Sequence, residues 1–164
     1  MSSPARFDHH MEPQAHMIRW LGAYADGNPD VRVGGPGTVI LDSRNEPEPD
    51  AVLLRRSESG GQSRISLEDY ITGAPELVVE ISASSVSMDL GPKLQAYQRN
   101  RVREYIVWQT FDEVITWFSL EGGVFQPMLP DAIGIMRSKV FPGLRLHVAA
   151  MLAGDMTTVL TAQR

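Results

Sequence analysis

The sequence predicts an α/β (α+β) domain built on one mixed β-sheet that is flanked by helices and extended by antiparallel hairpins. The first observation is the order strand, helix, strand between residues 77 and 108, which implies a right-handed parallel crossover. The second is a pair of apolar segments around residues 121–123, which is typical of an antiparallel hairpin. The third is the apolar pattern of residues 13–24, which predicts an amphipathic helix.

Local composition defines the elements of the first half of the chain. Apolar residues recur at helical spacing after Pro13, which suits a first helical turn, and the polar cluster at 26–29 ends this helix. Turn residues at 34–37 and 45–50 each precede an apolar segment, which we expect to be a strand. The expected elements are a helix at 13–24, strands at 38–41 and 51–54, and a glycine-rich loop at 57–63.

The second half of the chain contains the most apolar expected strand, at residues 77–82. A helix at 88–100 follows it, and Pro92 is tolerated only in the first turn of that helix. The remaining expected elements are a buried strand at 105–108, a hairpin of 114–120 and 124–128, a short strand around Phe141 and a C-terminal helix from His147.

Composition limits the classes of protein to which the chain can belong. Its 164 residues, 43% of them hydrophobic, suit a single globular domain at 13–164 after a flexible segment at 1–12 that contains His9 and His10. The chain has no cysteine, no apolar run of about 18 residues and no signal-peptide pattern at its start, which together predict a cytoplasmic protein. A net charge of −5 argues against a broad nucleic-acid-binding surface and still allows a local groove.

One acidic residue, Glu80, interrupts the apolar strand at 77–82. Strand alternation places Leu77, Val79 and Ile81 on one face of the sheet and Glu80 on the other. If helices cover both faces, an unpaired carboxylate there costs on the order of several kcal/mol unless a cation binds to it. If that face is wet, the cost disappears, and the strand alone does not decide between the two interpretations.

Asp89, Lys93 and Tyr97 lie four residues apart, so they form one stripe on the helix that follows this strand. Because that helix packs back against the sheet, the stripe is able to approach Glu80. The same spacing also fits an ordinary surface ion pair between Asp89 and Lys93, worth about a few tenths of a kcal/mol. Asp50 adds a third acid at the start of its own strand.

Two carboxylates and one ammonium group suit the hydrolysis of phosphodiester bonds. Carboxylates on neighbouring strands are hard oxygen ligands for Mg²⁺, which keeps several waters and activates one of them. An ammonium group beside that water orients it and offsets the charge that develops around phosphorus. The pattern makes Asp50, Glu80 and Lys93 candidates for this chemistry, while a wet strand face and a surface ion pair stay open as the alternatives.

Four segments together resemble the Uma-two family, a bacterial group of restriction-endonuclease-like proteins with a PD-(D/E)xK nuclease core. The segments are PEPDAVLL around Asp50, GAPELVVEISASS around Glu80, the pair Asp89 and Lys93, and AYQRNRVREYIVW. The resemblance extends from about His16 to Leu146. It implies a restriction-endonuclease-like fold and a nuclease activity.

The resemblance implies a role for each matched residue. Asp50 and Glu80 would be metal ligands, with the backbone carbonyl of Ile81 as a third. The lysine of the (D/E)xK motif would fall at position 82, where this chain has Ser82. Lys93 on the following helix is then the expected replacement, which reaches the same space from another element.

Further residues would support this centre. The resemblance implies that Ser82, Asp89 and Tyr97 lie behind the ligands and the lysine. The wider nuclease fold often adds an acidic residue from its first helix, for which Glu12 is the nearby candidate. His16 is the alternative, although a lone histidine on a helix is more often packed or exposed than a ligand.

The resulting expectation is a Mg²⁺- or Mn²⁺-dependent endonuclease that cleaves DNA, with RNA left open, and that works as a homodimer without a membrane partner. Arg99, Arg101 and Arg103 are either a solvated helix end or phosphate contacts. The alternative function is that of a catalytically inactive nuclease-fold homologue, acting as a binding or oligomerisation module. The hairpin at 114–128 is the candidate homodimer surface, through its aromatic side chains.

Overall fold

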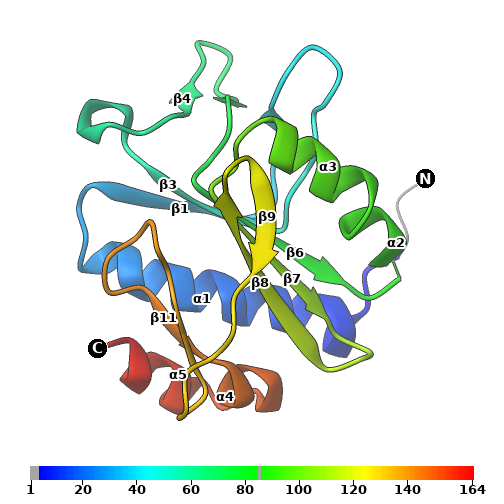
Figure 1. Cartoon of the computed structure of the whole chain (residues 1–164), viewed down its shortest axis with the longest axis vertical. Helices are drawn as coiled ribbons and strands as arrows, with labels where there is room; N and C mark the ends of the chain where they lie inside the picture. The colour runs from blue at the N-terminus through cyan, green and yellow to red at the C-terminus, as the bar shows by residue number, and fades with distance from the viewer. Residues whose placement is uncertain (1–3, 85) are drawn as a thin grey trace.

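The computed structural model describes residues 4–84 and 86–164 and has a six-stranded sheet at its centre (Figure 1). The strand order is β1-β3-β6-β7-β8-β9, in which β6 and β7 run parallel and the other neighbours run antiparallel. The strands are β1 (Val31–Gly34), β3 (Ala51–Arg55), β6 (Leu77–Ser82), β7 (Glu104–Gln109), β8 (Val114–Glu121) and β9 (Val124–Pro127). The predicted mixed sheet with one parallel crossover is confirmed.

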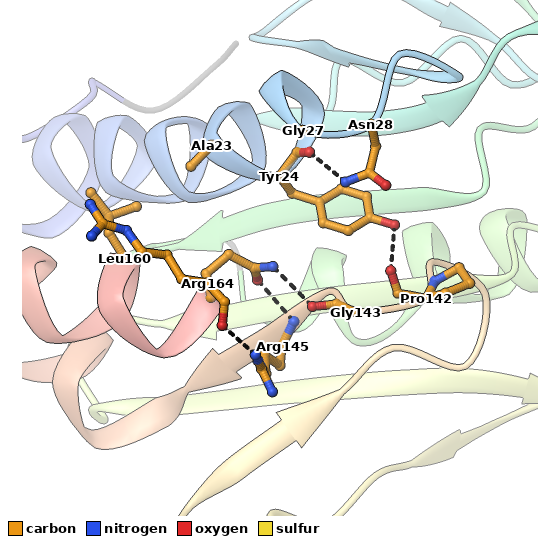
Figure 2. A pocket seen from close by; sticks show the side chains of 10 residues that line it. Ala23, Tyr24, Gly27, Asn28, Pro142, Gly143, Arg145, Leu160 and Arg164 are labelled. Atoms are coloured by element: carbon orange, nitrogen blue, oxygen red, sulfur yellow. Dashed lines mark hydrogen bonds between the residues drawn. The ribbon is translucent and has the colours of Figure 1, made fainter.

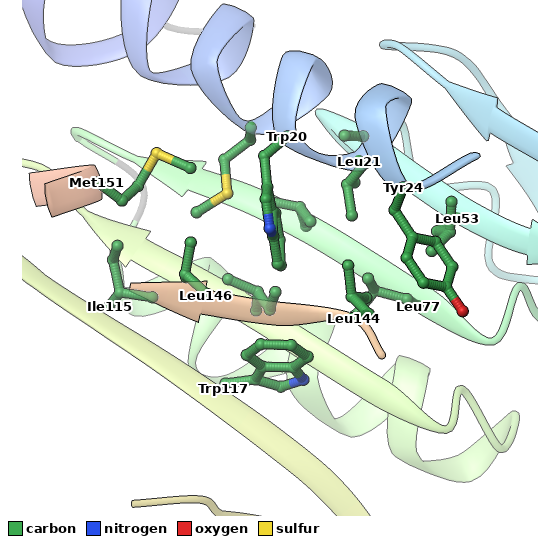
Figure 3. Close-up of a cluster of buried hydrophobic side chains, with 14 of the residues drawn as sticks. Trp20, Leu21, Tyr24, Leu53, Leu77, Ile115, Trp117, Leu144, Leu146 and Met151 are labelled. Atoms are coloured by element: carbon green, nitrogen blue, oxygen red, sulfur yellow. The ribbon is translucent and has the colours of Figure 1, made fainter. Parts of the chain in front are cut away.

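The N-terminal and C-terminal helices cover one face of this sheet (Figure 1). They are α1 (Glu12–Asp26), α4 (Val148–Ala153) and α5 (Met156–Gln163). Trp20, Leu21 and Tyr24 of α1 point toward the sheet, where Leu53 and Leu77 belong to the same buried cluster (Figure 3). The helix predicted at 13–24 is confirmed, but the stripe that packs α1 onto the sheet is Met17, Trp20, Leu21 and Tyr24. The spacing that predicts the helix is that of Ala15, Ile18, Leu21 and Ala25, of which only Leu21 is fully buried.

Two shorter helices cover the opposite face of the sheet. They are α2 (Val86–Asp89) and α3 (Pro92–Arg99). Tyr97 of α3 is fully buried there, and its ring centroid lies 5.0 Å from that of Tyr105 on β7. Val78 of β6 belongs to the same cluster. Both faces of the central strands are therefore covered.

Strand β6 is buried along its whole length. Leu77, Val79 and Ile81 join the cluster under α1, whereas Val78 joins the cluster under α3, as strand alternation predicts. Glu80 is only 2% exposed. The wet-face interpretation of Glu80 is therefore wrong, and its carboxylate lies between the sheet and α3.

The single helix predicted at 88–100 is wrong, because the chain breaks between α2 and α3. Pro92 has no backbone N–H and is at the start of α3, where a missing donor costs nothing. Gly91 before it has φ −117° and ψ −105°, and a Cβ there would lie 2.5 Å from the carbonyl oxygen of Ser87. The break turns α3 away from the axis of α2, so Asp89 and Lys93 approach the sheet from two separate helices.

The sequence also misses or misplaces several short elements. Phe141, expected in a strand, lies in the turn between the two strands of a C-terminal hairpin, where its fully buried ring fills the core. The C-terminal helix expected from His147 is split into α4 and α5 by Gly154 at φ +74°. Strand β1 and two strands of a small second sheet are not predicted. The remaining elements are β2 (Val39–Ile40), β4 (Arg64–Ile65), β5 (Ile71–Thr72), β10 (Ile135–Arg137), β11 (Arg145–His147), η1 (Phe7–Met11) and η2 (Ser57–Ser59).

The hairpin of β8 and β9 contributes its aromatic side chains to the monomer itself. Trp117 is fully buried, Phe125 is 6% exposed, and Phe118 packs against the cluster under α3. The expectation that these rings form a homodimer surface is therefore wrong. The flexibility expected of residues 1–12 stays a prediction. Within residues 4–84 and 86–164, no helix has both the length and the apolar character needed to cross a membrane.

Candidate active site

A cleft of about 620 Å³ opens where β3 begins and β6 ends. The antiparallel register pairs Ala51 with Val79, so Asp50 and Glu80 come next to each other on neighbouring strands. The side chains that line the cleft include those of His10, Gln14, Asp50, Glu80, Ile81 and Lys93. Four parts of the chain, namely the N-terminal segment, β3, β6 and α3, therefore contribute polar groups to one cleft.

Asp50 is held at the mouth of this cleft by hydrogen bonds to both of its carboxylate oxygens. Its Oδ2 accepts a hydrogen bond of 2.7 Å from the backbone N–H of Ile81, a donor that has no strand partner here because β3 begins only at Ala51. Its Oδ1 accepts one of 2.8 Å from Nε2 of Gln14. Burial raises the pKa of Asp50, and the Ile81 N–H and the nearby His10 and Lys93 partly offset that rise.

Glu80 lies deeper in the cleft and is held from the α3 side. Its Oε1 accepts a hydrogen bond of 2.8 Å from the Tyr97 hydroxyl, and Nζ of Lys93 lies 3.4 Å from its Oε2. Burial raises the pKa of Glu80 to about 8, and the negative charges of Asp89 and Asp50 add to the rise that Lys93 opposes. This buried group therefore lacks the positive charge that would keep it ionised at neutral pH.

Lys93 connects Glu80 with Asp89. Its Nζ lies 3.1 Å from Oδ1 of Asp89, a residue that is fully buried, so this pair is not the surface ion pair that the spacing also allows. Burial acts to lower the pKa of Lys93, but the attraction of Glu80 and Asp89 outweighs it and leaves the pKa raised. The ammonium group of Lys93 is therefore charged at neutral pH.

Ser82 and Tyr105 fix Asp89 in place. The Ser82 hydroxyl donates to Oδ2 of Asp89, and the Tyr105 hydroxyl donates to the backbone carbonyl of Asp89 at 2.8 Å. Ser82 stands where the (D/E)xK pattern has its lysine, and its role in the structure is to hold the carboxylate that holds Lys93. Ser82 and Lys93 together, through Asp89, thus provide one oriented ammonium group.

The backbone carbonyl of Ile81 faces the same side as Asp50. In a strand, the N–H and C=O of one residue point to the same neighbouring strand, and the N–H of Ile81 points to Asp50. The next carbonyl, that of Ser82, accepts from the N–H of Thr110 at 3.1 Å, on the opposite side. The alternation directs the Ile81 carbonyl toward the cleft, as the resemblance implies.

Two further polar residues line the cleft, namely His10, which the sequence assigns to a flexible segment, and Gln14, which it does not single out. Nε2 of His10 lies 3.1 Å from Oδ1 of Asp50, the oxygen that also accepts from Gln14. One signal identifies Gln14, because it lies three and seven residues before the buried Met17 and Leu21 and so shares the core-facing stripe of α1. A polar residue on such a stripe has a buried partner in most proteins. His10 precedes that stripe by one helical turn.

Glu12 and His16, the candidates from the first helix, do not line the cleft. Glu12 is exposed at the first position of α1. His16 faces the C-terminal helices, where its Cε1 lies 3.7 Å from the position of a Cβ at Gly154. Each lies two residues from Gln14, a rotation of about 200° around the helix at 3.6 residues per turn. Their side chains therefore point to the side of α1 opposite Gln14.

The donor set of the cleft fits a hard divalent cation. Within residues 4–84 and 86–164, no group of three or more His, Cys, Asp and Glu side chains is arranged so that it could hold a metal ion. Mg²⁺ needs no such group, because it keeps several waters and binds through one or two carboxylates. Asp50, Glu80 and Asp89 place three buried carboxylates near the single ammonium group of Lys93. A bound cation would supply the positive charge that Glu80 needs to ionise at neutral pH.

A second hollow, of about 480 Å³, lies between α1 and the C-terminal segment (Figure 2). Its polar groups are paired with the backbone around them. The Tyr24 hydroxyl donates to the Pro142 carbonyl at 2.8 Å, and Nε2 of Gln163 donates to the Gly143 carbonyl at 2.9 Å. These bonds join the two ends of the chain and give the hollow a structural explanation.

Comparison with solved structures shows the fold. A crystal structure titled “putative nuclease belonging to DUF820”, from Anabaena variabilis ATCC 29413, superposes with a TM-score of 0.72 at 10% sequence identity. The match covers 93% of this chain and 85% of that chain. The type IIG restriction endonuclease BpuSI matches with a TM-score of 0.46 at 14% identity, over 92% of this chain and 16% of that one. A comparison with curated protein sequences gives no match.

The family comparison includes the N-terminal segment as well as the sheet. The matching family model is described as “Putative restriction endonuclease” and covers residues 1–149. The match therefore starts before His16, where the resemblance is expected to begin, and it contains His10, Gln14, Asp50 and Glu80. On this evidence the chain belongs to the Uma2 (Uma-two) family and has a restriction-endonuclease-like fold.

Proposed function

We propose that this protein is a Mg²⁺- or Mn²⁺-dependent endonuclease that hydrolyses phosphodiester bonds in DNA. The observation that supports the proposal most is the convergence of Asp50, Glu80 and Lys93 on one cleft from three different elements. Membership in a family described as “Putative restriction endonuclease” supports DNA as the substrate. RNA contains the same bond, so it remains the substrate to compare.

The carboxylates of Asp50 and Glu80 and the carbonyl of Ile81 would hold the ion. When bound, the ion would supply positive charge to a phosphate oxygen and make a nearby water more acidic. Gln14 and the Ile81 N–H fix the Asp50 carboxylate through its two oxygens. The Tyr97 hydroxyl fixes Glu80, so both ligands are held before any ion arrives.

Lys93 has the role of orienting water and balancing charge at phosphorus. Its ammonium group is charged at neutral pH, and Asp89 holds it at 3.1 Å. An ammonium group has three donors, so hydrogen bonds to Asp89 and Glu80 leave one for water or for a phosphate oxygen. Such a donor stabilises charge that develops in the transition state more than charge in the bound substrate.

The cleft itself does not define how DNA binds or whether two subunits act together. Arg99, Arg101 and Arg103 are all exposed, but they lie at the end of α3 and the start of β7, which is the end of the sheet opposite the cleft, so only DNA that extends beyond the cleft would reach them. Cleavage of both DNA strands would require two centres, so a homodimer remains part of the proposal. The aromatic side chains of the β8–β9 hairpin take no part in it.

The test is cleavage of supercoiled plasmid DNA, single-stranded DNA and single-stranded RNA with Mg²⁺ or Mn²⁺. We expect Glu80→Ala and Lys93→Ala to lower the rate on the order of 100-fold or more. Lys139→Ala is the matched control, since it removes the other lysine, which pairs with Glu121 at the surface. Equal rates in all four proteins would assign the cleavage to a contaminant and refute the proposal.

The alternative is a nuclease-fold homologue that binds nucleic acid without cutting it. The observation in its favour is that Tyr97 and Lys93 already engage both oxygens of Glu80. This alternative predicts DNA binding with no cleavage, and no change of melting temperature with Mg²⁺ or Mn²⁺. The proposed endonuclease predicts both a metal response and cleavage.

A further inference from the structure

His10 lines the cleft and contacts Asp50, but neither the expected metal site nor the residues expected to support it give it a role. Its Nε2 lies 3.1 Å from Oδ1 of Asp50, and its side chain is 24% exposed and lines the cleft. His10 lies in the short π-helix η1 (Phe7–Met11), which continues directly into α1 at Glu12. The question is why His10 of this segment contacts the carboxylate of Asp50.

Neighbouring residues hold the segment around His10 in place. The backbone carbonyl of His9 accepts a hydrogen bond of 2.7 Å from the Thr110 hydroxyl, at the end of β7. The ring of His9 stacks on Phe111 with centroids 3.9 Å apart and planes 10° apart, and the guanidinium of Arg6 lies 5.8 Å from the same ring. With α1 fixed on the other side, the imidazole of His10 is anchored from both directions.

Each carboxylate oxygen of Asp50 already has one hydrogen-bond donor without His10. Ile81 and Gln14 already donate to its two oxygens, at 2.7 and 2.8 Å. The distance of 3.1 Å between the His10 nitrogen and the Asp50 oxygen also fits two ligands of one metal ion. Two ligands at right angles on one ion, each about 2.1 Å away, are about 3 Å from each other.

The geometry points to His10 and Asp50 as a pair of ligands for the cation that the cleft would hold, and so to a preference for a first-row transition-metal ion over Mg²⁺. This inference rests on the proposed function, because it assumes that the cleft binds a cation at all. Imidazole nitrogen is a good ligand for first-row transition metals, whereas Mg²⁺ takes oxygen ligands. A site of two carboxylates, one carbonyl and one imidazole therefore favours Mn²⁺ over Mg²⁺.

The experiment measures metal binding without any nuclease reaction. Dissociation constants for MnCl₂ and MgCl₂ are determined by calorimetry on the full chain for the wild type, His10→Ala and His10→Gln. Pulsed electron paramagnetic resonance of bound Mn²⁺ then detects a coupled imidazole nitrogen. His16→Gln is the matched control, because it removes an imidazole of the next helical turns whose side chain faces Gly154.

We expect the wild type to bind Mn²⁺ more tightly than Mg²⁺ and to show the nitrogen coupling. Removal of His10 is expected to weaken Mn²⁺ binding on the order of 10- to 100-fold, with a much smaller change for Mg²⁺, and to abolish the coupling. His10→Gln, which keeps a hydrogen-bond donor for Asp50, is expected to behave like His10→Ala. His16→Gln is expected to keep both the affinity and the coupling.

Two results would overturn the inference in different ways. If Mn²⁺ binds and Asp50→Ala abolishes binding, but the coupling is absent or survives in His10→Ala, His10 is not a ligand and the proposed endonuclease still stands. If the wild type binds neither ion, the inference falls together with the metal-dependent function.

Discussion

Strands β6 and β7 have buried acids at both ends, and the two ends use them differently. At one end, Glu76 and Glu104 are 3% and 0% exposed. Glu76 accepts hydrogen bonds from the backbone N–H groups of Arg55 and Gln62, at 3.2 and 3.0 Å. Glu104 accepts from the Ser138 hydroxyl at 2.6 Å and the Lys139 N–H at 2.8 Å.

At the other end, Asp50 and Glu80 are as well buried but open onto a cleft. The carboxylate of Glu80 shares Lys93 with a third acid, Asp89, and Glu80 takes no backbone donor among its described hydrogen bonds. The comparison teaches that burial of an acid does not identify a functional site. Acids whose donors lie in the loops around them brace those loops, as Glu76 and Glu104 do, whereas acids that line a cleft beside Lys93 are able to accept a cation.

The largest expected effect is that of Asp50→Asn on cleavage. The amide keeps an oxygen for the Ile81 N–H but loses the negative charge, so we expect the rate to fall on the order of 100-fold or more. The melting temperature should change little by comparison. The check is plasmid cleavage at saturating Mn²⁺ together with calorimetric melting of the same samples. A variant that cuts at the wild-type rate would remove Asp50 from the site.

At the opposite end of the strands, a substitution of Glu104 is expected to lower stability and to leave the metal response unchanged. Glu104→Ala leaves the Lys139 N–H and the Ser138 hydroxyl without their acceptor in a buried position, which costs about 2 kcal/mol of unfolding free energy. The metal dependence of melting should survive, because Glu104 is remote from the cleft. Urea unfolding with and without Mn²⁺ measures both quantities. Loss of the metal response in a folded variant would break the distinction between the two ends.

A smaller effect is expected at the support of Glu80. Tyr97→Phe removes the hydroxyl that donates to Oε1 at 2.8 Å and keeps the ring that packs on Tyr105. We expect a loss of about 1 kcal/mol of stability and roughly tenfold weaker metal binding, since residues that orient a ligand affect affinity in this range. Calorimetric titration with Mn²⁺ checks this. Unchanged affinity would mean that Tyr97 only packs.

The smallest expected effect is a pH dependence at Glu104. Burial raises the pKa of Glu104, which its hydrogen bonds to Ser138 and Lys139 only partly offset. The folded state therefore holds this proton more tightly than the unfolded chain. The stability that results is fully present below the unfolded pKa of about 4.5 and is lost as pH rises through the folded pKa.

Glu104→Gln, which has no proton to lose, isolates this contribution. The difference in unfolding free energy between wild type and variant should shift in favour of the variant as pH rises above 4.5. Urea unfolding of both proteins between pH 4 and pH 7.5 measures that difference. A difference that stays constant across the range would contradict a raised pKa.

The parts of the site that follow from the sequence are those set by strand periodicity. The alternation of β6 places Glu80 opposite the α1 face, and the start of β3 after Pro49 places Asp50 beside it. The spacing of Asp89, Lys93 and Tyr97 predicts that their side chains approach the sheet together, and it does so despite the break at Gly91. Local patterns make these residues candidates, but only the burial of Glu80 and Asp89 in the structure decides against a wet strand face and a surface ion pair.

The remaining parts depend on contacts between distant segments. His10 reaches Asp50 because Thr110 and Phe111 anchor its neighbour His9, and no local pattern records a contact over a hundred residues apart. Phe141 resembles a strand residue because it is apolar, yet its ring fills the core from a turn. In both cases tertiary packing overrides the local signal.

The central claim is that the acids at one end of the strands form a cation site while those at the other end do not. Thermal unfolding with and without excess MnCl₂, on wild type, Glu80→Gln and Glu104→Gln, tests this claim most directly. At a 100-fold excess over the dissociation constant, we expect wild type and Glu104→Gln to melt roughly 5–10 °C higher with the ion, and Glu80→Gln to show no shift. An equal shift in all three proteins, or none in the wild type, would contradict the claim.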